Sequence, residues 1–258
     1  MRNLFNVLLF WLVLFASTVK AETLVLAADL WCPYNCEPDS DKPGFMVEIA
    51  RAVFAQKGID VEYRLMPWSR AVQSTREGDF DAVIGATLND APGFVFPAVE
   101  QGQMLTSLWV LPEFKWRYQR IASLSDVILG VSAGYSYGAD IDGYVADPRN
   151  QNYIHVLFGT KPLAQGLKML KAGRIDVMVE DESVFRYHVD QFPDGIPYVN
   201  AGTVDNPTAD TKVYVAFSPA KPDSAQWAEM LSKGIADMRA SGDLLRILQR
   251  YGLRDWRD

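Results

Sequence analysis

The most constraining feature of the sequence is a motif that occurs twice. Gly78-Asp-Phe-Asp-Ala-Val-Ile-Gly85 is matched, with a constant offset of 95 positions (173 against 78), by Gly173-Arg-Ile-Asp-Val-Met-Val-Glu180. In both copies, a glycine suited to the left-handed end of a helix precedes an aspartate and the apolar residues of a central strand. The repeat predicts two similar lobes in place of one continuous sheet.

The segments around each copy alternate between strand and helix patterns. The first half predicts strands at 23–28, 61–66 and 81–85 and helices at 45–54 and 69–76. The second half predicts strands at 128–131, 154–158 and 175–179 and helices at 163–171 and 183–189. Since this alternation is typical of parallel strands joined by crossover helices, we expect an α/β fold with a doubly wound mixed sheet in each lobe.

Two extended apolar stretches, 103–111 and 197–203, suit strands that cross between the lobes. After the second stretch come a strand pattern and two amphipathic helix patterns. If these last elements pack on the first lobe, the chain crosses twice, and two crossings make a hinge. We therefore expect one lobe from 22–106 with 204–258 and another from 107–203.

The first 21 residues have the pattern of a cleavable export signal. Arg2 precedes an apolar run over 4–16, and Ala21 is a small residue at the expected cleavage point before Glu22. The alternative, a membrane anchor, requires about 20 apolar residues and is disfavoured by the shorter run. The mature chain does not begin with a cysteine that could carry a lipid. The expected location is the periplasm.

Composition excludes one large class of partner. The chain is 49% hydrophobic and 22% charged, values typical of a globular protein, and its formal net charge is −7. Removal of residues 1–21 makes the charge more negative, because they contain Arg2 and Lys20 but no acidic residue. A protein this acidic repels phosphate backbones, so we expect no nucleic-acid partner.

The only two cysteines, Cys32 and Cys36, flank the segment Pro33-Tyr-Asn35. In an oxidising compartment, this spacing favours a small-loop disulfide. A metal site would need more ligands, and the two histidines are distant in sequence. A redox motif would have the spacing C-x-x-C. We expect a disulfide that holds the backbone near the adjacent aromatic residues, and no metal.

The order of these elements resembles the extracellular solute-binding protein family 3, which includes polar amino-acid receptors of ABC uptake systems. Besides the repeated motif, the resemblance rests on Gly44-Phe-Met-Val-Glu48-Ile, Pro67-Trp-Ser-Arg70-Ala, Gly130-Val-Ser-Ala-Gly134 and Gly242-Asp-Leu-Leu-Arg-Ile-Leu. The resemblance implies a two-lobed periplasmic binding protein fold of type II, with a small-molecule ligand in the cleft. It also implies an inner-membrane ABC permease as partner. We expect a monomer without a cofactor.

Ligands of open α/β sheets bind beyond the carboxyl ends of the strands, which selects 29–34, 68–70, 85–90, 134–137 and 180–181. Trp31, Tyr34 and Trp68 in these segments could form an aromatic box around a flat or cationic ligand. The alternative is that they are core or rim aromatics. The resemblance implies ligand contact for Trp68 and for one of Trp31 and Tyr34.

Two polar residues are candidates at the ends of second-lobe strands. Asp181 matches the acid that binds the ligand's amino group in the family, or it is simply an acid at a helix N-terminus. Its neighbour Glu180 is expected to point away from the cleft. Ser136, ahead of a short helix, could receive a carboxylate, cap that helix, or do both.

One departure from the family concerns the ligand's charge. Amino-acid-binding members carry an arginine after the strand that matches 81–85, and it grips the α-carboxylate. This sequence has no lysine or arginine from Glu77 through Phe114, and Asp90 stands near the expected place. Because an aspartate cannot replace a bidentate guanidinium, the ligand need not be a standard α-amino acid. Arg70 is the best substitute anion contact, or else a solvated helix residue or part of a structural ion pair.

Three functions remain open. The first is a periplasmic receptor that captures a small polar molecule for ABC uptake. The second is a ligand-sensing partner of a membrane receptor. The third is a dehydratase-like enzyme on the same scaffold, with Asp181 or Glu180 as general acid or base. Since no nucleophile–histidine pair, metal cluster or phosphate loop is visible, we expect no enzyme.

Overall fold

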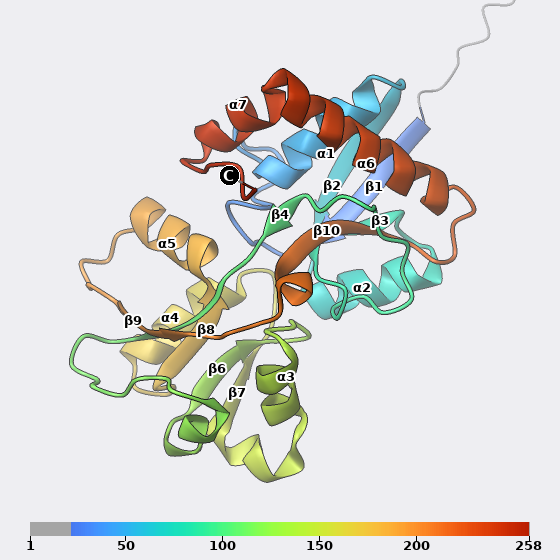
Figure 1. Ribbon diagram of the computed structural model, residues 1–258. Coiled ribbons are helices and arrows are strands. Elements are labelled where there is room, and N and C mark those ends of the chain that lie inside the picture. The colour runs from blue at the N-terminus through green and yellow to red at the C-terminus, as the bar shows by residue number, and fades with distance from the viewer. Residues whose placement is uncertain (1–21, 258) are drawn as a thin grey trace, which may run out of the picture.

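The computed structural model describes residues 22–257, so the predicted signal peptide at 1–21 lies outside the described residues. These residues form two lobes, each built on a five-stranded sheet (Figure 1). The strand orders are β2-β1-β3-β10-β4 and β7-β6-β8-β5-β9. The predicted α/β fold with two mixed sheets is therefore confirmed.

The first sheet contains β1 (Glu22–Ala28), β2 (Ile59–Leu65), β3 (Ala82–Ala86), β4 (Gly102–Gln103) and β10 (Lys212–Phe217). β1 runs parallel to β2 and β3, whereas β10 is antiparallel to β3 and β4. Its helices are α1 (Phe45–Ala55), α2 (Trp68–Glu77), α6 (Ser224–Ser241) and α7 (Asp243–Arg250). Helices α1, α6 and α7 pack together, and α2 packs separately against β1 and β3 (Figure 1).

The second sheet contains β5 (Thr106–Val110), β6 (Leu129–Ser132), β7 (Ile154–Leu157), β8 (Val177–Asp181) and β9 (Val199–Thr203). Its α-helices are α3 (Ala139–Ala146), α4 (Pro162–Lys171) and α5 (Glu182–Gln191). The part of the chain that the structure describes also has three short 3-10 helices, η1 (Ile121–Asp126), η2 (Pro148–Tyr153) and η3 (Thr208–Thr211), the last of which lies between β9 and β10. None of the helices within residues 22–257 is long and apolar enough to cross a membrane.

The repeated motif makes the same local structure in both lobes. Gly78 and Gly173 have φ of 92° and 63°, the left-handed region that a glycine enters without a steric penalty. Three residues after each glycine, an aspartate accepts a backbone N–H from the neighbouring strand region. Asp81 accepts the N–H of Val25 at 2.8 Å, and Asp176 accepts that of Ile128 at 2.8 Å. The motif therefore ties a helix end to the central strands of each sheet.

The chain passes between the sheets twice, from β4 to β5 and from β9 to β10 (Figure 1). The two passages are hydrogen-bonded to each other. The N–H of Met104 donates to Thr211 O at 2.8 Å, and the N–H of Val204 donates to Thr106 O at 2.9 Å. Two hinge crossings were expected and are present. The division into two rigid units stays a prediction, with one unit from 22–106 and 204–258 and the other from 107–203.

Candidate ligand-binding site

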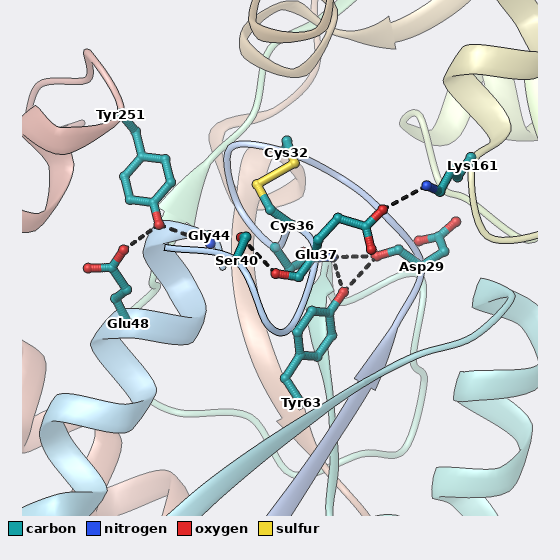
Figure 2. The surroundings of a disulfide bond; sticks show 11 residues. Asp29, Cys32, Cys36, Glu37, Ser40, Gly44, Glu48, Tyr63, Lys161 and Tyr251 are labelled. Atoms are coloured by element: carbon teal, nitrogen blue, oxygen red, sulfur yellow. Dashed lines mark hydrogen bonds and ion pairs between the residues drawn. A yellow bond between two sulfur atoms is a disulfide. The ribbon is translucent and has the colours of Figure 1, made fainter. Parts of the chain in front are cut away.

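A tight loop after β1 presents aromatic residues toward the second lobe. Cys32 and Cys36 are joined by a disulfide, as predicted (Figure 2). The N–H of Trp31 donates to Asn35 O at 2.9 Å and closes the same loop. The Trp31 ring stacks on the Tyr34 ring with centroids 4.1 Å apart. The disulfide and the stacked rings together hold the Trp31 indole in one orientation.

A small cavity of about 20 Å³ lies between the lobes beside this loop. It is lined from both lobes by Asp29, Trp31, Asn35, Trp68, Ile84, Gly85, Asp90, Met104, Tyr135, Ser136, Tyr137 and Glu180. Most of these residues follow or end the parallel strands β1, β3, β6 and β8, or begin α2 after β2, where the strand-end rule places a ligand. A cavity of this size holds about one water-sized group, so the two lobes meet closely here.

Three of the predicted site residues, Trp31, Trp68 and Ser136, line this cavity. Trp68 is 4% exposed, and its Nε1 donates to Gly134 O in the other lobe at 3.1 Å. The backbone N–H of Ser136 donates to Asp90 Oδ1 at 2.7 Å. The N–H expected to receive a ligand carboxylate therefore binds a carboxylate of the protein itself.

The structure does not bring the other three, Tyr34, Arg70 and Asp181, to the cavity. Tyr34 lies beneath Trp31, and its hydroxyl donates to Gln103 O at 2.6 Å. Arg70 is exposed and lines a neighbouring surface depression. A role in ligand binding for these three side chains stays a prediction.

Asp181 is occupied by backbone groups. Its Oδ1 accepts the N–H of Val184 at 2.9 Å, which caps α5, and its Oδ2 accepts the N–H of Leu105 at 2.7 Å. This geometry fits the alternative role at a helix N-terminus. Burial raises the pKa of Asp181 to about 7, against the lowering effect of these hydrogen bonds.

The expectation that Glu180 points away from the cleft is wrong. Consecutive residues of β8 point to opposite faces, and the cavity lies on the face of Glu180 and not on that of Asp181. Glu180 Oε1 accepts hydrogen bonds from Trp31 Nε1–H and from the backbone N–H of Asp181, both at 2.9 Å. Glu180 is only 1% exposed, and its Oε2 has no hydrogen-bond partner.

Sequence reasoning also missed the roles of Asp29 and Asp90. Both oxygens of Asp29 lie 2.9 Å from the Tyr135 hydroxyl, which donates to them. Asp90 Oδ2 accepts from the N–H and the hydroxyl of Thr87, both at 2.7 Å. Both acids lay in segments that the strand-end rule selects, and that was the available signal. Their partners Tyr135 and Ser136 come from the other lobe.

The cavity is acidic without a compensating base. Among the described residues, no lysine, arginine or histidine lines it. Burial raises the pKa of Asp29 to about 7, that of Asp90 to about 6 and that of Glu180 to about 8. Neighbouring carboxylates add to the effect, because like charges disfavour ionisation. The cavity therefore favours either protonated carboxyl groups or a positively charged guest.

Each of these three carboxyl groups is bonded to a donor of the opposite lobe. Asp29 and Asp90 of the first lobe accept from Tyr135 and Ser136, and Glu180 of the second lobe accepts from Trp31. Outside the cavity, Lys161 before α4 forms an ion pair with Glu37 beside the disulfide loop at 2.7 Å (Figure 2). The same carboxyl groups that make the cavity acidic therefore also hold the two lobes in contact.

The arrangement does not suit a metal ion. Within residues 22–257, no group of three or more histidine, cysteine, aspartate or glutamate side chains could hold one. The three cavity carboxyl groups come from separate strand ends and bind separate donors. Their negative charge is spread around the walls, which suits a molecule with its own hydrogen-bond donors.

Known proteins share this architecture. Residues 24–91 match the bacterial extracellular solute-binding proteins, family 3, and no curated protein matches the sequence. An ancestral arginine-binding protein bound to glutamine has a TM-score of 0.69 and 18% identity, covering 89% of this chain and 97% of that chain. An amino-acid ABC transporter substrate-binding protein of Streptococcus pneumoniae, bound to L-arginine, has a TM-score of 0.69 and 21% identity. The match covers 89% of this chain and 94% of that chain.

A histidine kinase sensor domain with similarity to periplasmic binding proteins has a TM-score of 0.70 and 18% identity, and the match covers 89% of this chain and 95% of that chain. At these identities, the structural likeness establishes the fold. The match over residues 24–91 and the two-lobed fold shared along most of the chain confirm the resemblance to the extracellular solute-binding proteins of family 3.

Proposed function

We propose that the protein is a periplasmic solute-binding protein that captures a small polar molecule between its lobes and delivers it to an ABC permease of the inner membrane. The observation that carries this proposal is the cavity lined from both lobes, with hydrogen bonds that join the lobes around it. A ligand seated there would touch both sheets and stabilise their contact. The family match and the amino-acid-binding structures of the same fold support this function.

A catalytic role is not part of the proposal. The cavity acids are bonded to donors of the opposite lobe, an arrangement that suits lobe closure better than proton transfer to a substrate. The likeness to a histidine kinase sensor domain favours a second candidate, a protein that reports ligand occupancy to a membrane receptor. Both candidates require the same binding event, and they differ only in the membrane protein that receives the closed form.

The binding event can be tested by a thermal-shift screen of residues 22–258 against amino acids, amines, organic acids and osmolytes. A ligand at 100 times its Kd stabilises the folded state by about 2.7 kcal/mol, enough to raise Tm by several degrees. Arg70→Ala tests the predicted anion contact of Arg70, which lies outside the cavity. Unchanged affinity for the identified ligand would remove Arg70 from the site. If no solute raises Tm, the proposed function fails.

The destination of the ligand needs a second measurement. Uptake of the radiolabelled ligand should be lost when the gene is deleted and restored by the intact gene. N-terminal sequencing of the exported protein should begin at Glu22. Uptake that persists in the deletion strain, with loss of a signalling response, would favour the sensing role.

A further inference from the structure

Resting on the proposed function, we propose that the cleft selects small organic amines that carry an ammonium group and no carboxylate. The ligand's nitrogen would donate hydrogen bonds to Glu180 and Asn35, and the aromatic walls would cover its carbon atoms. Four features of the cavity favour such a ligand: its unpartnered atoms, its charge, its donors and its aromatic walls.

The unpartnered atoms of the cavity walls are acceptors. Among buried side-chain atoms of the described residues, Glu180 Oε2 and Asn35 Oδ1 lack a hydrogen-bond partner, and both residues line the cavity. The two residues are each 1% exposed, so bulk water does not satisfy them. A buried acceptor without a partner is costly, and a bound N–H group removes that cost. An ammonium has three such donors.

The Asn35 amide is held so that its oxygen faces the cavity. Its Nδ2 donates to Asp29 O at 2.7 Å and to the Tyr63 hydroxyl at 3.2 Å, which leaves Oδ1 on the other side. A Cβ built on Gly85 would approach this oxygen to 2.9 Å. Since Gly85 also has a φ of 94°, the absence of a side chain there keeps the space in front of Oδ1 open.

The charge of the cavity disfavours a ligand that carries a carboxylate. The cavity has three acids, and no basic side chain among the described residues lines it. A ligand carboxylate would meet these acids at short range in a medium of low polarity, where repulsion between like charges is strong. A bound ammonium would instead favour the ionised form of all three acids and be attracted by them.

Three cavity donors able to hold a carboxylate are already used by the protein. Trp31 Nε1, the Tyr135 hydroxyl and the Ser136 N–H donate to Glu180, Asp29 and Asp90, respectively. A ligand carboxylate could take one of these donors only by breaking a contact between the lobes. An amine leaves all of them in place.

The walls suit an alkylammonium. The indole of Trp31 and that of Trp68 line the cavity with Tyr135 and Tyr137, and the Trp68 and Tyr135 rings meet edge to face with centroids 6.1 Å apart. Aromatic faces attract cations and cover methylene groups. Because the cavity has a volume of about 20 Å³, an ammonium fits it directly, and a longer chain requires the lobes to part slightly.

The test uses matched pairs that differ by one carboxylate: methylamine with glycine, putrescine with L-ornithine, and agmatine with L-arginine. Affinities are measured by isothermal titration calorimetry at pH 8 on residues 22–258. At least one amine should bind, and at least tenfold more tightly than its amino acid. Equal or tighter binding of the amino acids would overturn the inference and leave the proposed function intact.

Two other outcomes separate the inference from the proposed function. If none of the six probes binds but an acidic or neutral solute from the broader screen does, the inference is wrong and the function stands. If no solute of any class binds, both fail. The result therefore shows which of the two statements is at fault.

A matched pair of variants tests the contact itself. Glu180→Gln removes the charge at the unpartnered oxygen and should weaken amine binding at least tenfold. Glu182→Gln, two positions further along, removes an equivalent charge outside the cavity and should change affinity less than twofold. Circular dichroism establishes that both variants are folded. Unchanged amine affinity in folded Glu180→Gln would refute the assigned contact.

Discussion

Replacement of Glu180 by glutamine should make the ligand-free protein more stable at neutral pH. Burial, with smaller effects from the carboxyl groups of Asp181 and Asp29, raises the pKa of Glu180 from 4.5 to about 8. The folded protein therefore holds a proton that the unfolded chain releases. Because the folded state then binds more protons than the unfolded state, stability falls as the pH rises from 4.5 towards 8.

The size of the effect follows from the span between the two pKa values. The interval from pH 5 to pH 7 lies between them, and each pH unit changes the free energy of unfolding by 1.36 kcal/mol per titrating group. Glu180 thus removes about 3 kcal/mol of stability over this interval. Glutamine does not titrate, so the variant should lose about 3 kcal/mol less than the wild type.

The assay is urea denaturation at pH 5 and pH 7, followed by tryptophan fluorescence. Bound solute is first removed by unfolding and refolding, because a ligand would add its own stabilisation. Free energies come from linear extrapolation. The nearby carboxyl groups of Asp29, Asp90 and Asp181 titrate in both proteins. The hydroxyls of Tyr34, Tyr135 and Tyr137 stay protonated in both, because burial raises their pKa values well above 10. The comparison between the two proteins cancels most of the effect of the carboxyl groups.

Glu182→Gln is the control, since Glu182 is paired with Arg186 outside the cavity. It should follow the wild type at both pH values. If Glu180→Gln also lost as much stability as the wild type between pH 5 and pH 7, the carboxyl group of Glu180 would not be held protonated, and the reasoning from its burial would be refuted.

Two further predictions concern the lobes and the loop. Tyr135→Phe removes the hydroxyl that donates to both oxygens of Asp29, and it should weaken the closed arrangement by about 2 kcal/mol. Small-angle scattering should then report a larger radius of gyration, whereas an unchanged radius would show that this contact does not hold the lobes together. Cys32→Ser with Cys36→Ser opens a short loop and should lower the free energy of unfolding by about 2 kcal/mol, as measured by urea denaturation. The wild type in reducing agent should show the same loss, and equal stability with and without the disulfide would contradict the prediction.

Much of the fold could be predicted because its signals are local. The glycine and aspartate of the repeated motif act on neighbouring backbone, so the two copies make equivalent contacts through Asp81 and Asp176. The disulfide between Cys32 and Cys36 is local as well. In contrast, the 3-10 helices η1, η2 and η3 have no strong periodic pattern and were not predicted.

The candidate site was predicted only in part, because its chemistry depends on contacts between the lobes. The positions of Trp31, Trp68 and Ser136 followed from the strand-end rule. The exchange of roles between Asp181 and Glu180 did not. Their alternation along β8 is a sequence property, but which of the two faces meets the other lobe is not.

The sequence by itself determined two similar α/β lobes, two crossings between them and an acidic chain with no arginine at the usual position for a ligand carboxylate. The lobes and the crossings depend on residue types at short spacings, which local periodicity and backbone preference translate into structure. The missing arginine is visible only against the pattern of the family that the sequence resembles. Only the tertiary structure decided that Asp29, Asp90 and Glu180 share one cavity. Their donors lie on the opposite lobe, 46 to 149 positions away along the chain, so the closed packing of the two sheets sets both their hydrogen bonds and their pKa values.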